Sequence, residues 1–169
     1  MLSWLNPRAR RGNWRFNGGH EMEWMLLPFR RYAEFAGRSC RREYWMFALL
    51  SGVVYALAAI LMFAGGLFGL AQNSANFSSL TPLFYLGLAI AIIFFLAALV
   101  PSIAVTVRRL HDRNLSGWWY LGVIVLGQIP YLGFLINIAF LVFMVMPGDN
   151  GPNRFGADPL DPSRVDVFA

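Results

Sequence analysis

The chain has 169 residues, of which 57% are hydrophobic and only 14% are charged. Soluble domains carry about 25% charged residues, so this composition favours a membrane protein over a soluble domain with a large core. The single cysteine, Cys40, excludes an internal disulfide bond and a cysteine-based zinc cluster. It lies among arginines, a setting that can lower the pKa of a thiol, but we interpret it as an unreactive side chain.

The first 43 residues are the basic part of the chain, with nine arginines and four glutamates. Residues 1–23 predict a flexible basic extension, and no apolar run follows the basic stretch, so it is not a cleavable signal. Residues 23–35 place Trp24 and Phe29 among charged side chains, which is typical of an amphipathic segment in the membrane interface. Pro28 favours a break in this segment or a helix that begins near it.

Two membrane spans are predicted next. The stretch 44–107 contains no charged residue, and a single helix of these 64 residues would be about 96 Å long. A spanning helix needs about 20 apolar residues, so the stretch must turn once. The polar patch 72–79 is the obvious place, and we predict spans over about 44–70 and 83–107.

The third apolar segment, residues 118–146, is ambiguous because its 29 residues are too few for two full spans and more than one straight span requires. Pro130 removes a backbone donor at its centre, between Gly127 and Gly133. Two interpretations stay open: a span kinked at Pro130, or a re-entrant hairpin that returns the tail to its starting side. We favour the kinked span, because irregular backbone exposed to lipid is costly.

The fold class that follows is an all-α membrane protein with three hydrophobic segments and an N-terminal interfacial segment. We expect one membrane domain over residues 24–159, between the extension 1–23 and a C-terminal tail 160–169. Residues 147–159 are dense in turn formers and predict a compact irregular cap.

A charged island, residues 108–113, separates the second and third apolar segments. Two spans return the chain to its starting side, so the island and the N-terminal segment share one face. Together they hold twelve of the fourteen arginines. The positive-inside rule then predicts that this face and the N-terminus are cytoplasmic.

This face also holds the candidate binding residues. We expect Arg41 or Arg42 to pair with Asp112, and Arg108 or Arg109 to pair with Glu43, which makes the face a topology anchor held by an intramolecular network. The functional alternative is a site for a lipid headgroup phosphate or a partner carboxylate. The candidates are Arg38, Arg41, Arg42, Glu43, Arg108, Arg109, His111, Asp112 and Arg113.

Enzymatic and metal functions are not expected. His111 and Asp112 need further ligands to hold a metal, and the other histidine, His20, lies in the extension. Acid–base catalysis needs a nucleophile, and Ser116 lacks the context of a nucleophile elbow. We expect neither a metal nor a cofactor, and the nearer polyanion for the arginines is a membrane surface rather than a nucleic acid.

The leading hypothesis is a non-enzymatic module that binds anionic membrane lipids or a partner protein through its arginine-rich face. A small oligomeric transporter or channel component is the alternative, with a hydrated path past Gln128 and Asn137. An enzyme acting on a lipid headgroup comes third. The sequence leaves open whether the partner is a second copy or another membrane protein.

Three ordered motifs resemble domain-of-unknown-function family 805, which comprises small bacterial inner-membrane proteins. Residues 32–45 are similar to the family pattern Y-x-x-F-x-G-R-x-x-R-x-E-Y-W, and residues 108–112 with 116–119 resemble its central motif. Residues 153–159 are similar to its closing N-R-[YF]-G-x-D-P. Besides the charged candidates, the matching positions are Gly37, Tyr44, Trp45, Ser116, Gly117, Trp118, Asn153, Arg154, Gly156, Asp158 and Pro159.

The resemblance covers about residues 24–159 and implies a multi-pass protein of the bacterial inner membrane. Cys40 departs from the pattern, which usually has a small residue at this position, and the first 23 residues fall outside it. The family has no assigned reaction, so the resemblance implies a fold and a location and leaves the activity open.

Overall fold

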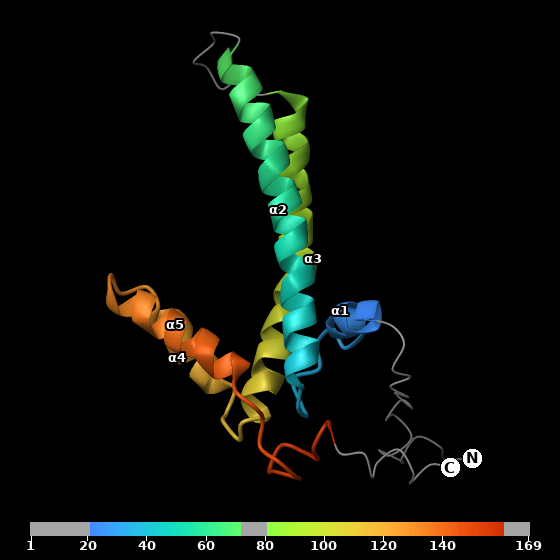
Figure 1. The fold of residues 1–169 in the computed structure, drawn as a ribbon, viewed down its shortest axis with the longest axis vertical. Coiled ribbons are helices and arrows are strands. Elements are labelled where there is room, and N and C mark those ends of the chain that lie inside the picture. The colour runs from blue at the N-terminus through green and yellow to red at the C-terminus, as the bar shows by residue number, and fades with distance from the viewer. Residues whose placement is uncertain (1–20, 72–80, 161–169) are drawn as a thin grey trace, which may run out of the picture.

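The computed structural model describes residues 21–71 and 81–160. Within these residues the chain forms α1 (Glu21–Arg30), α2 (Arg41–Ala71), α3 (Pro82–His111), α4 (Trp118–Leu126) and α5 (Leu132–Val145), and no strand. Figure 1 shows α2 and α3 side by side as a long antiparallel rod, with α1 and the α4–α5 pair near its lower end. The polar patch 72–79, where we expect the turn, and most of the basic extension and tail lie outside the described residues.

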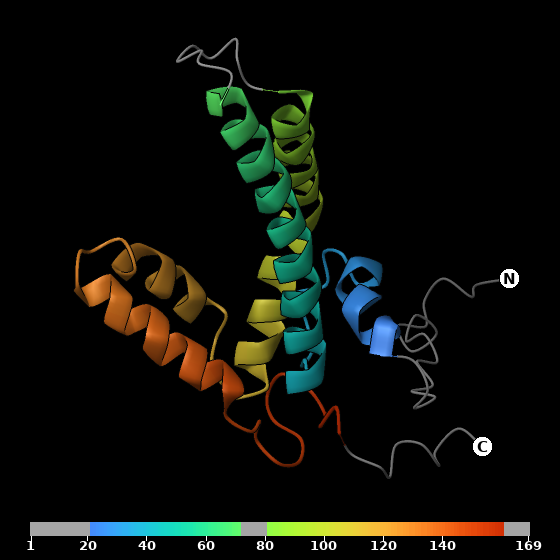
Figure 2. The same cartoon turned by 45° about the horizontal axis from the view of Figure 1, so that its top comes forward.

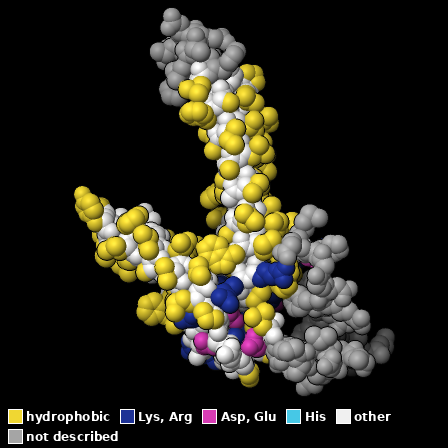
Figure 3. All heavy atoms as spheres, viewed as in Figure 1, with side chains coloured by type: hydrophobic (Ala, Val, Ile, Leu, Met, Phe, Trp, Pro, Cys, Tyr) yellow, Lys and Arg dark blue, Asp and Glu magenta, His cyan; other side chains and the backbone are white. Residues whose placement is uncertain are grey.

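The helices α2 and α3 have the length and surface of membrane spans. Their segments Arg41–Leu67 and Pro82–His111 are long and apolar enough to cross a membrane. Helices of 27 and 30 residues rise about 40 and 45 Å, which exceeds a hydrocarbon core of about 30 Å. Large apolar side chains such as Phe63 and Ile93 are exposed. Figure 3 shows hydrophobic side chains along the surface of the rod. Water would penalise such a surface, whereas lipid would not.

Two glycines let α2 and α3 approach closely. A Cβ atom on Gly87 would lie 2.6 Å from the carbonyl oxygen of Ala58 and 2.8 Å from Cγ of Met62. A Cβ atom on Gly65 would meet the backbone of Phe84. Small residues at such positions allow helix backbones to pack tightly in lipid, where no hydrophobic force drives association.

The helix α1 packs against α2 and α3 near the lower end of the rod. The ring of Phe29 makes edge contacts with Phe47 of α2 and Phe94 of α3, at centroid distances of 5.4 and 6.3 Å. Phe29 therefore joins the small core around Phe47 and Val105. Pro28 lies inside α1 rather than at a break, and the helix ends two residues later, at Arg30.

The third apolar segment is a helical hairpin, so our preference for one kinked span is wrong. The chain reverses between Leu126, where α4 ends, and Leu132, where α5 begins. Tyr131 adopts a φ of 63°, and Gly133 lies so close to Gly127 that a Cβ atom there would meet the Gly127 carbonyl oxygen. Three successive N–H groups of residues 127–129 bond to carbonyls three or four residues earlier. The turn satisfies most of its own backbone donors, which lowers the cost that we assigned to a fold-back.

The hairpin returns the chain to the end of the rod at which it began. Residues 147–160 follow α5 as an irregular segment with one isolated bridge, Asn153 to Gly156. The backbone N–H of Asp149 donates to the carbonyl oxygen of Asp112, 2.9 Å away, at the end of α3. The segment is thus a compact cap on the same end as the island.

Candidate functional site

The charged residues gather at the lower end of the rod, where Figure 3 shows arginine and acidic side chains intermixed. We call this region the polar end. It combines the segment between α1 and α2, the first turn of α2, the last turn of α3 with the island, and the cap 147–160. Five of its charged residues are buried, which is unusual for arginine, aspartate and glutamate: Arg38, Glu43, Arg108, Arg109 and Asp112.

The first ionic pair of the polar end joins α2 to α3. Nη2 of Arg108 donates to Oε1 of Glu43 at 2.7 Å, and the two side chains are 0% and 3% exposed. Nη1 of Arg108 donates to the carbonyl oxygen of Glu34 at 2.5 Å. Glu43 lies in the first turn of α2 and Arg108 in the last turn of α3, where the helix dipoles favour these charges. The expected pairing of Glu43 with Arg108 or Arg109 is confirmed.

The second ionic cluster is centred on Asp112. Nε of Arg38 donates to its Oδ1 at 2.9 Å, and Nη1 of Arg109 donates to its Oδ2. Our expectation that Arg41 or Arg42 pairs with Asp112 is therefore wrong. Arg38 precedes α2 and turns towards the island, whereas Arg41 starts the helix. Burial raises the pKa of the Asp112 carboxyl group, and the hydrogen bond from Arg38 and the charge of Arg109 act in the opposite direction.

Three arginines cap the carboxyl end of α5. Arg109 donates to the carbonyl oxygens of Met144 and Met146, Arg41 to that of Val145 at 3.2 Å, and Arg113 to that of Pro147 at 2.8 Å. The last carbonyls of a helix lack partners within the helix, and cations are favoured there. Arginines of α2, α3 and the island thus hold the hairpin in place.

The cap 147–160 is bonded to the same network. Arg38 also donates to the carbonyl oxygens of Asp149 and Gly151, each at 2.5 Å. Nδ2 of Asn153 donates to the carbonyl oxygen of His111 at 2.9 Å, and Oδ2 of Asp158 accepts from the N–H of Gly151 at 3.0 Å. These contacts bring the first, central and closing motifs of the sequence together.

The remaining motif residues shape the turns around this network. Gly37 adopts a φ of 87°, which favours glycine. A Cβ atom on Gly117 would lie 2.7 Å from Val107, so glycine lets the chain start α4 close to α3. Gly156 also has a positive φ, in the tight turn of the cap. Tyr44 and Trp45 contact each other edge to face at 5.5 Å near the start of α2, and Trp118 is exposed.

His111 is held in place by contacts with Gly37 and Phe155. Its Nδ1 lies 3.1 Å from the carbonyl oxygen of Gly37, and its ring stacks on Phe155 at a centroid distance of 3.9 Å. His111 also lines an open groove of about 370 Å³ with Phe35, Val107, Ser116, Gly117 and Trp118. Both carboxylate oxygens of Asp112 face arginines instead, so the pair expected of an acid–base site does not form.

The surroundings of Cys40 differ from those of a thiol activated by arginine neighbours. The side chain is 4% exposed. Burial raises its pKa, and the charges of Glu43 and Asp112 add to that effect. Our interpretation of an unreactive side chain fits this environment. Among the described residues no three His, Cys, Asp or Glu side chains group as metal ligands would.

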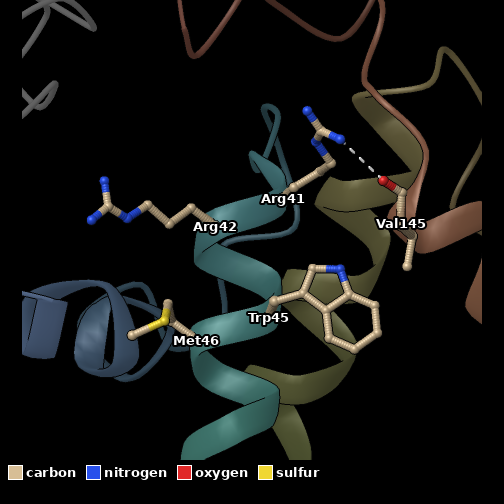
Figure 4. Close-up of a pocket in the computed structure, with 5 residues that line it drawn as sticks. All are labelled: Arg41, Arg42, Trp45, Met46 and Val145. Carbon is tan, nitrogen blue, oxygen red and sulfur yellow. Dashed lines mark hydrogen bonds between the residues drawn. The ribbon is translucent and has the colours of Figure 1, made fainter.

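One groove of the polar end does present cationic side chains to the outside. It has a volume of about 320 Å³ and is lined by Arg41, Arg42, Trp45, Met46 and Val145. Figure 4 shows Arg41 and Trp45 on the side of Val145, and Arg42 and Met46 on the side of α1. Arg42 also lies over the ring of Trp24 at 5.5 Å. We call this the Arg41 groove.

Several residues of the network are not among our candidates. Gly148 packs on the carboxylate of Asp112 so closely that any Cβ atom would overlap it. Arg31 lies 3.8 Å from Glu43 and forms a bidentate pair with Glu34. The sequence signal for Gly148 was the density of turn formers after α5. Nothing in the pattern pointed to the backbone carbonyls of α5 as partners for arginine.

Comparison with known proteins identifies the family. The family model described as "Protein of unknown function (DUF805)" matches residues 32–157. The chain belongs to this family. The match includes the first two motifs, the closing motif up to residue 157 and most of the polar end, so it covers most of the residues that the network connects.

Two relatives of this DUF805 protein come from Escherichia coli (strain K12). Inner membrane protein YhaI is 35% identical over 138 residues, which cover 82% of this chain and 96% of the relative. Inner membrane protein YhaH is 37% identical over 138 residues, or 82% of this chain and 97% of the relative. These names support a location in the bacterial inner membrane and point to no enzymatic family. No solved structure matches the chain significantly.

Proposed function

We propose that this DUF805 protein is a non-enzymatic membrane module that binds the phosphate of an anionic lipid headgroup in the Arg41 groove. The observation that carries the proposal is the groove itself, in which two arginines and a tryptophan lie at the end of a membrane-length helix. Tryptophan is enriched at the headgroup level, and basic pockets at the cytoplasmic end of spans suit anionic lipids.

The buried arginines are poor candidates for the same role. Arg38 and Arg109 share the carboxylate of Asp112, and Arg108 faces Glu43. A lipid phosphate would have to displace these partners from a site closed to solvent. Arg41 differs, because its hydrogen bond to the Val145 carbonyl uses one guanidinium donor, and a guanidinium has five. Among the described residues it forms no ion pair.

The electrostatics of the groove favour an anion over a cation. Arg41 and Arg42 lie in the first turn of α2, where the helix dipole is positive. Glu43, the acidic residue of that turn, is already paired with Arg108. An anion in the groove would meet two arginines and a helix N-terminus without a competing free carboxylate from Glu43.

The proposed orientation places the polar end and the N-terminus in the cytoplasm. The arginines concentrate there, and the positive-inside rule assigns such a face to the cytoplasmic side. The transporter alternative receives no support from the third segment, because its two amides are used locally. Nε2 of Gln128 bonds to the carbonyl of Ile124, and Nδ2 of Asn137 to that of Gly133.

The test is a lipid titration of the full chain in mild detergent, followed by native mass spectrometry. The probes are phosphatidylglycerol and phosphatidylcholine with identical acyl chains. Because charge-assisted hydrogen bonds contribute about 1.5–3 kcal/mol, Arg41→Gln with Arg42→Gln should weaken phosphatidylglycerol binding at least about tenfold. Phosphatidylcholine binding should not change.

A second pair of substitutions controls for net charge. Arg30, at the end of α1, and Arg154, in the cap, are exposed arginines that lie outside the groove. Arg30→Gln with Arg154→Gln removes the same charge and should leave the preference for phosphatidylglycerol intact. An equal loss in both double variants would mean a diffuse charge effect, and unchanged binding in the Arg41 and Arg42 variant would refute the site.

A further inference from the structure

The hairpin of α4 and α5 exposes apolar side chains in every direction. No residue of α4 is buried, and Trp118, Trp119 and Val125 are each at least 60% exposed. At the turn and in α5, Tyr131 is 92% exposed and Phe134 69% exposed. Figures 1 and 2 show the hairpin leaving the lower end of the rod and diverging from α2 and α3. The spanning pair does not cover these side chains.

The distribution of polar groups on the hairpin indicates what does cover them. Residues 114–148 contain no charged side chain. A hairpin that docked on a second copy outside the membrane would bury one face in the interface. Its opposite face would contact water and would be polar, whereas α4 is apolar all round. A helix that is hydrophobic on every side is buried in protein or surrounded by lipid. Since the rest of the described chain leaves most side chains of both helices exposed, acyl chains are the medium that fits all faces at once.

Most backbone donors at the tip of the hairpin are satisfied internally, which lowers the cost of placing the tip in lipid. The N–H groups of residues 127–129 bond within the turn, as do those of Leu132 and Gly133. Pro130 has no N–H group to satisfy. The side-chain amides of Gln128 and Asn137 donate to carbonyls of their own helices.

The length of the hairpin excludes a crossing. The 9 residues of α4 rise about 14 Å and the 14 residues of α5 about 21 Å, against a hydrocarbon core of about 30 Å. Both open ends lie at the polar end, and Arg113 ties them together by its bond to the Pro147 carbonyl. The aromatic residues at the start of α4, Trp118 and Trp119, suit the headgroup level.

We propose that the α4–α5 hairpin is a re-entrant element that inserts into the leaflet next to the polar end, surrounded by acyl chains, with its tip inside the hydrocarbon. The chain would then displace lipid from one leaflet more than from the other. This inference does not rest on lipid binding in the Arg41 groove, since it involves acyl chains and different residues.

Spin labels at the tip test the proposal in vesicles that contain the full chain. Tyr131→Cys and Phe134→Cys replace exposed side chains, so both variants should fold. If one of them fails to fold, the other still reports on the position of the tip. Oxygen, which concentrates in lipid, should collide with these labels far more often than a water-soluble nickel complex does. The unsubstituted chain is the labelling blank, because Cys40 is buried.

Two further positions calibrate the measurement. Ile93 is exposed near the middle of α3 and gives the value for a lipid-facing span, and Asn150 is exposed in the cap and gives the value for water. A ratio of oxygen to nickel collisions at 131 and 134 close to that of Ile93→Cys supports the proposal. A ratio close to that of Asn150→Cys places the hairpin in water, and low accessibility to both reagents means that protein covers it. Either result would overturn the proposal.

Discussion

The buried charged side chains of the polar end are stabilised because each one contacts an opposite charge or a helix end. An isolated arginine taken out of water costs several kcal/mol. Arg38, Arg108 and Arg109 avoid most of this cost, since each faces a carboxylate and at least one backbone carbonyl oxygen. Removing one carboxylate therefore matters more than removing one surface charge.

Asp112→Asn should destabilise the protein by about 3–5 kcal/mol, because it leaves the charges of Arg38 and Arg109 buried without a counter-ion. The substitution keeps the shape of the side chain, so the loss reports on charge. Thermal unfolding in detergent measures it. Asp149→Asn is the matched control, since that carboxylate is exposed and makes no hydrogen bond or ion pair with described residues; its effect should stay within about 0.5 kcal/mol. Equal melting temperatures for the two variants would contradict the buried network.

For single residues, the sequence predicts the partner in an ion pair only where both side chains lie at helix ends. The pairing of Glu43 with Arg108 or Arg109 was predictable, since these residues lie at helix termini that return to the same side. The choice of Arg38 for Asp112 was not. It depends on α2 beginning at Arg41, which leaves Arg38 in the extended segment that turns towards the island. A sequence pattern does not give that boundary to within a turn.

At the scale of elements, the contact between α2 and α3 depends on backbone proximity rather than on large side chains. Gly87 is buried against Ala58 and Met62, whereas Gly52 has no neighbour within 4 Å of its expected Cβ position. The two glycines occupy comparable positions in long apolar helices and differ in what surrounds them. Replacing each glycine by alanine therefore separates the effect of helix packing, at Gly87, from the effect of helix propensity, at Gly52.

Gly87→Ala should lower stability by about 1–3 kcal/mol, because the added methyl group overlaps the carbonyl oxygen of Ala58 and forces the helices apart. Gly52→Ala should leave stability unchanged or raise it by up to about 1 kcal/mol through helix propensity. Unfolding of both variants by denaturing detergent gives the comparison. A Gly87 variant as stable as the Gly52 variant would show that α2 and α3 are held together elsewhere.

The elements themselves were largely predictable, and the hairpin was not. Uncharged stretches of sufficient length fix α2 and α3 by hydropathy alone, and the spans that we expected, 44–70 and 83–107, lie inside the observed helices. In the third segment Pro130 is compatible with a kink or a reversal. The reversal needs a positive φ at Tyr131 and the close approach of Gly133 to Gly127. The signal for this reversal in the sequence is the pair Gly127 and Gly133, which lie on either side of Pro130.

At the scale of the whole molecule, the polar end joins segments that are far apart in the sequence. Arg38 links the start of the chain to the cap, and Arg109 links α3 to the end of α5. Charges at one end and apolar surface along the rod are the basis of the orientation that we propose. The reversal at Pro130 adds a consequence that one kinked span would not have, because it places the cap on the side of the N-terminal segment.

A reporter fused after Ala169 should consequently show cytoplasmic activity. Residues 147–160 bond to α3 and to the segment before α2, and the nine residues that follow include charged side chains that would not enter hydrocarbon. A green fluorescent reporter, which matures in the cytoplasm, should be bright at this position. An alkaline phosphatase reporter, which needs export, should be inactive there.

The matched fusion carries the same reporters after Leu80, between the two spans. There the phosphatase should be active and the fluorescent protein dark, because one span separates this position from the polar end. The opposite pattern at both positions would invert the orientation and leave the hairpin intact. Export at both positions would mean that residues 118–146 cross the membrane, which would contradict the fold-back at Pro130.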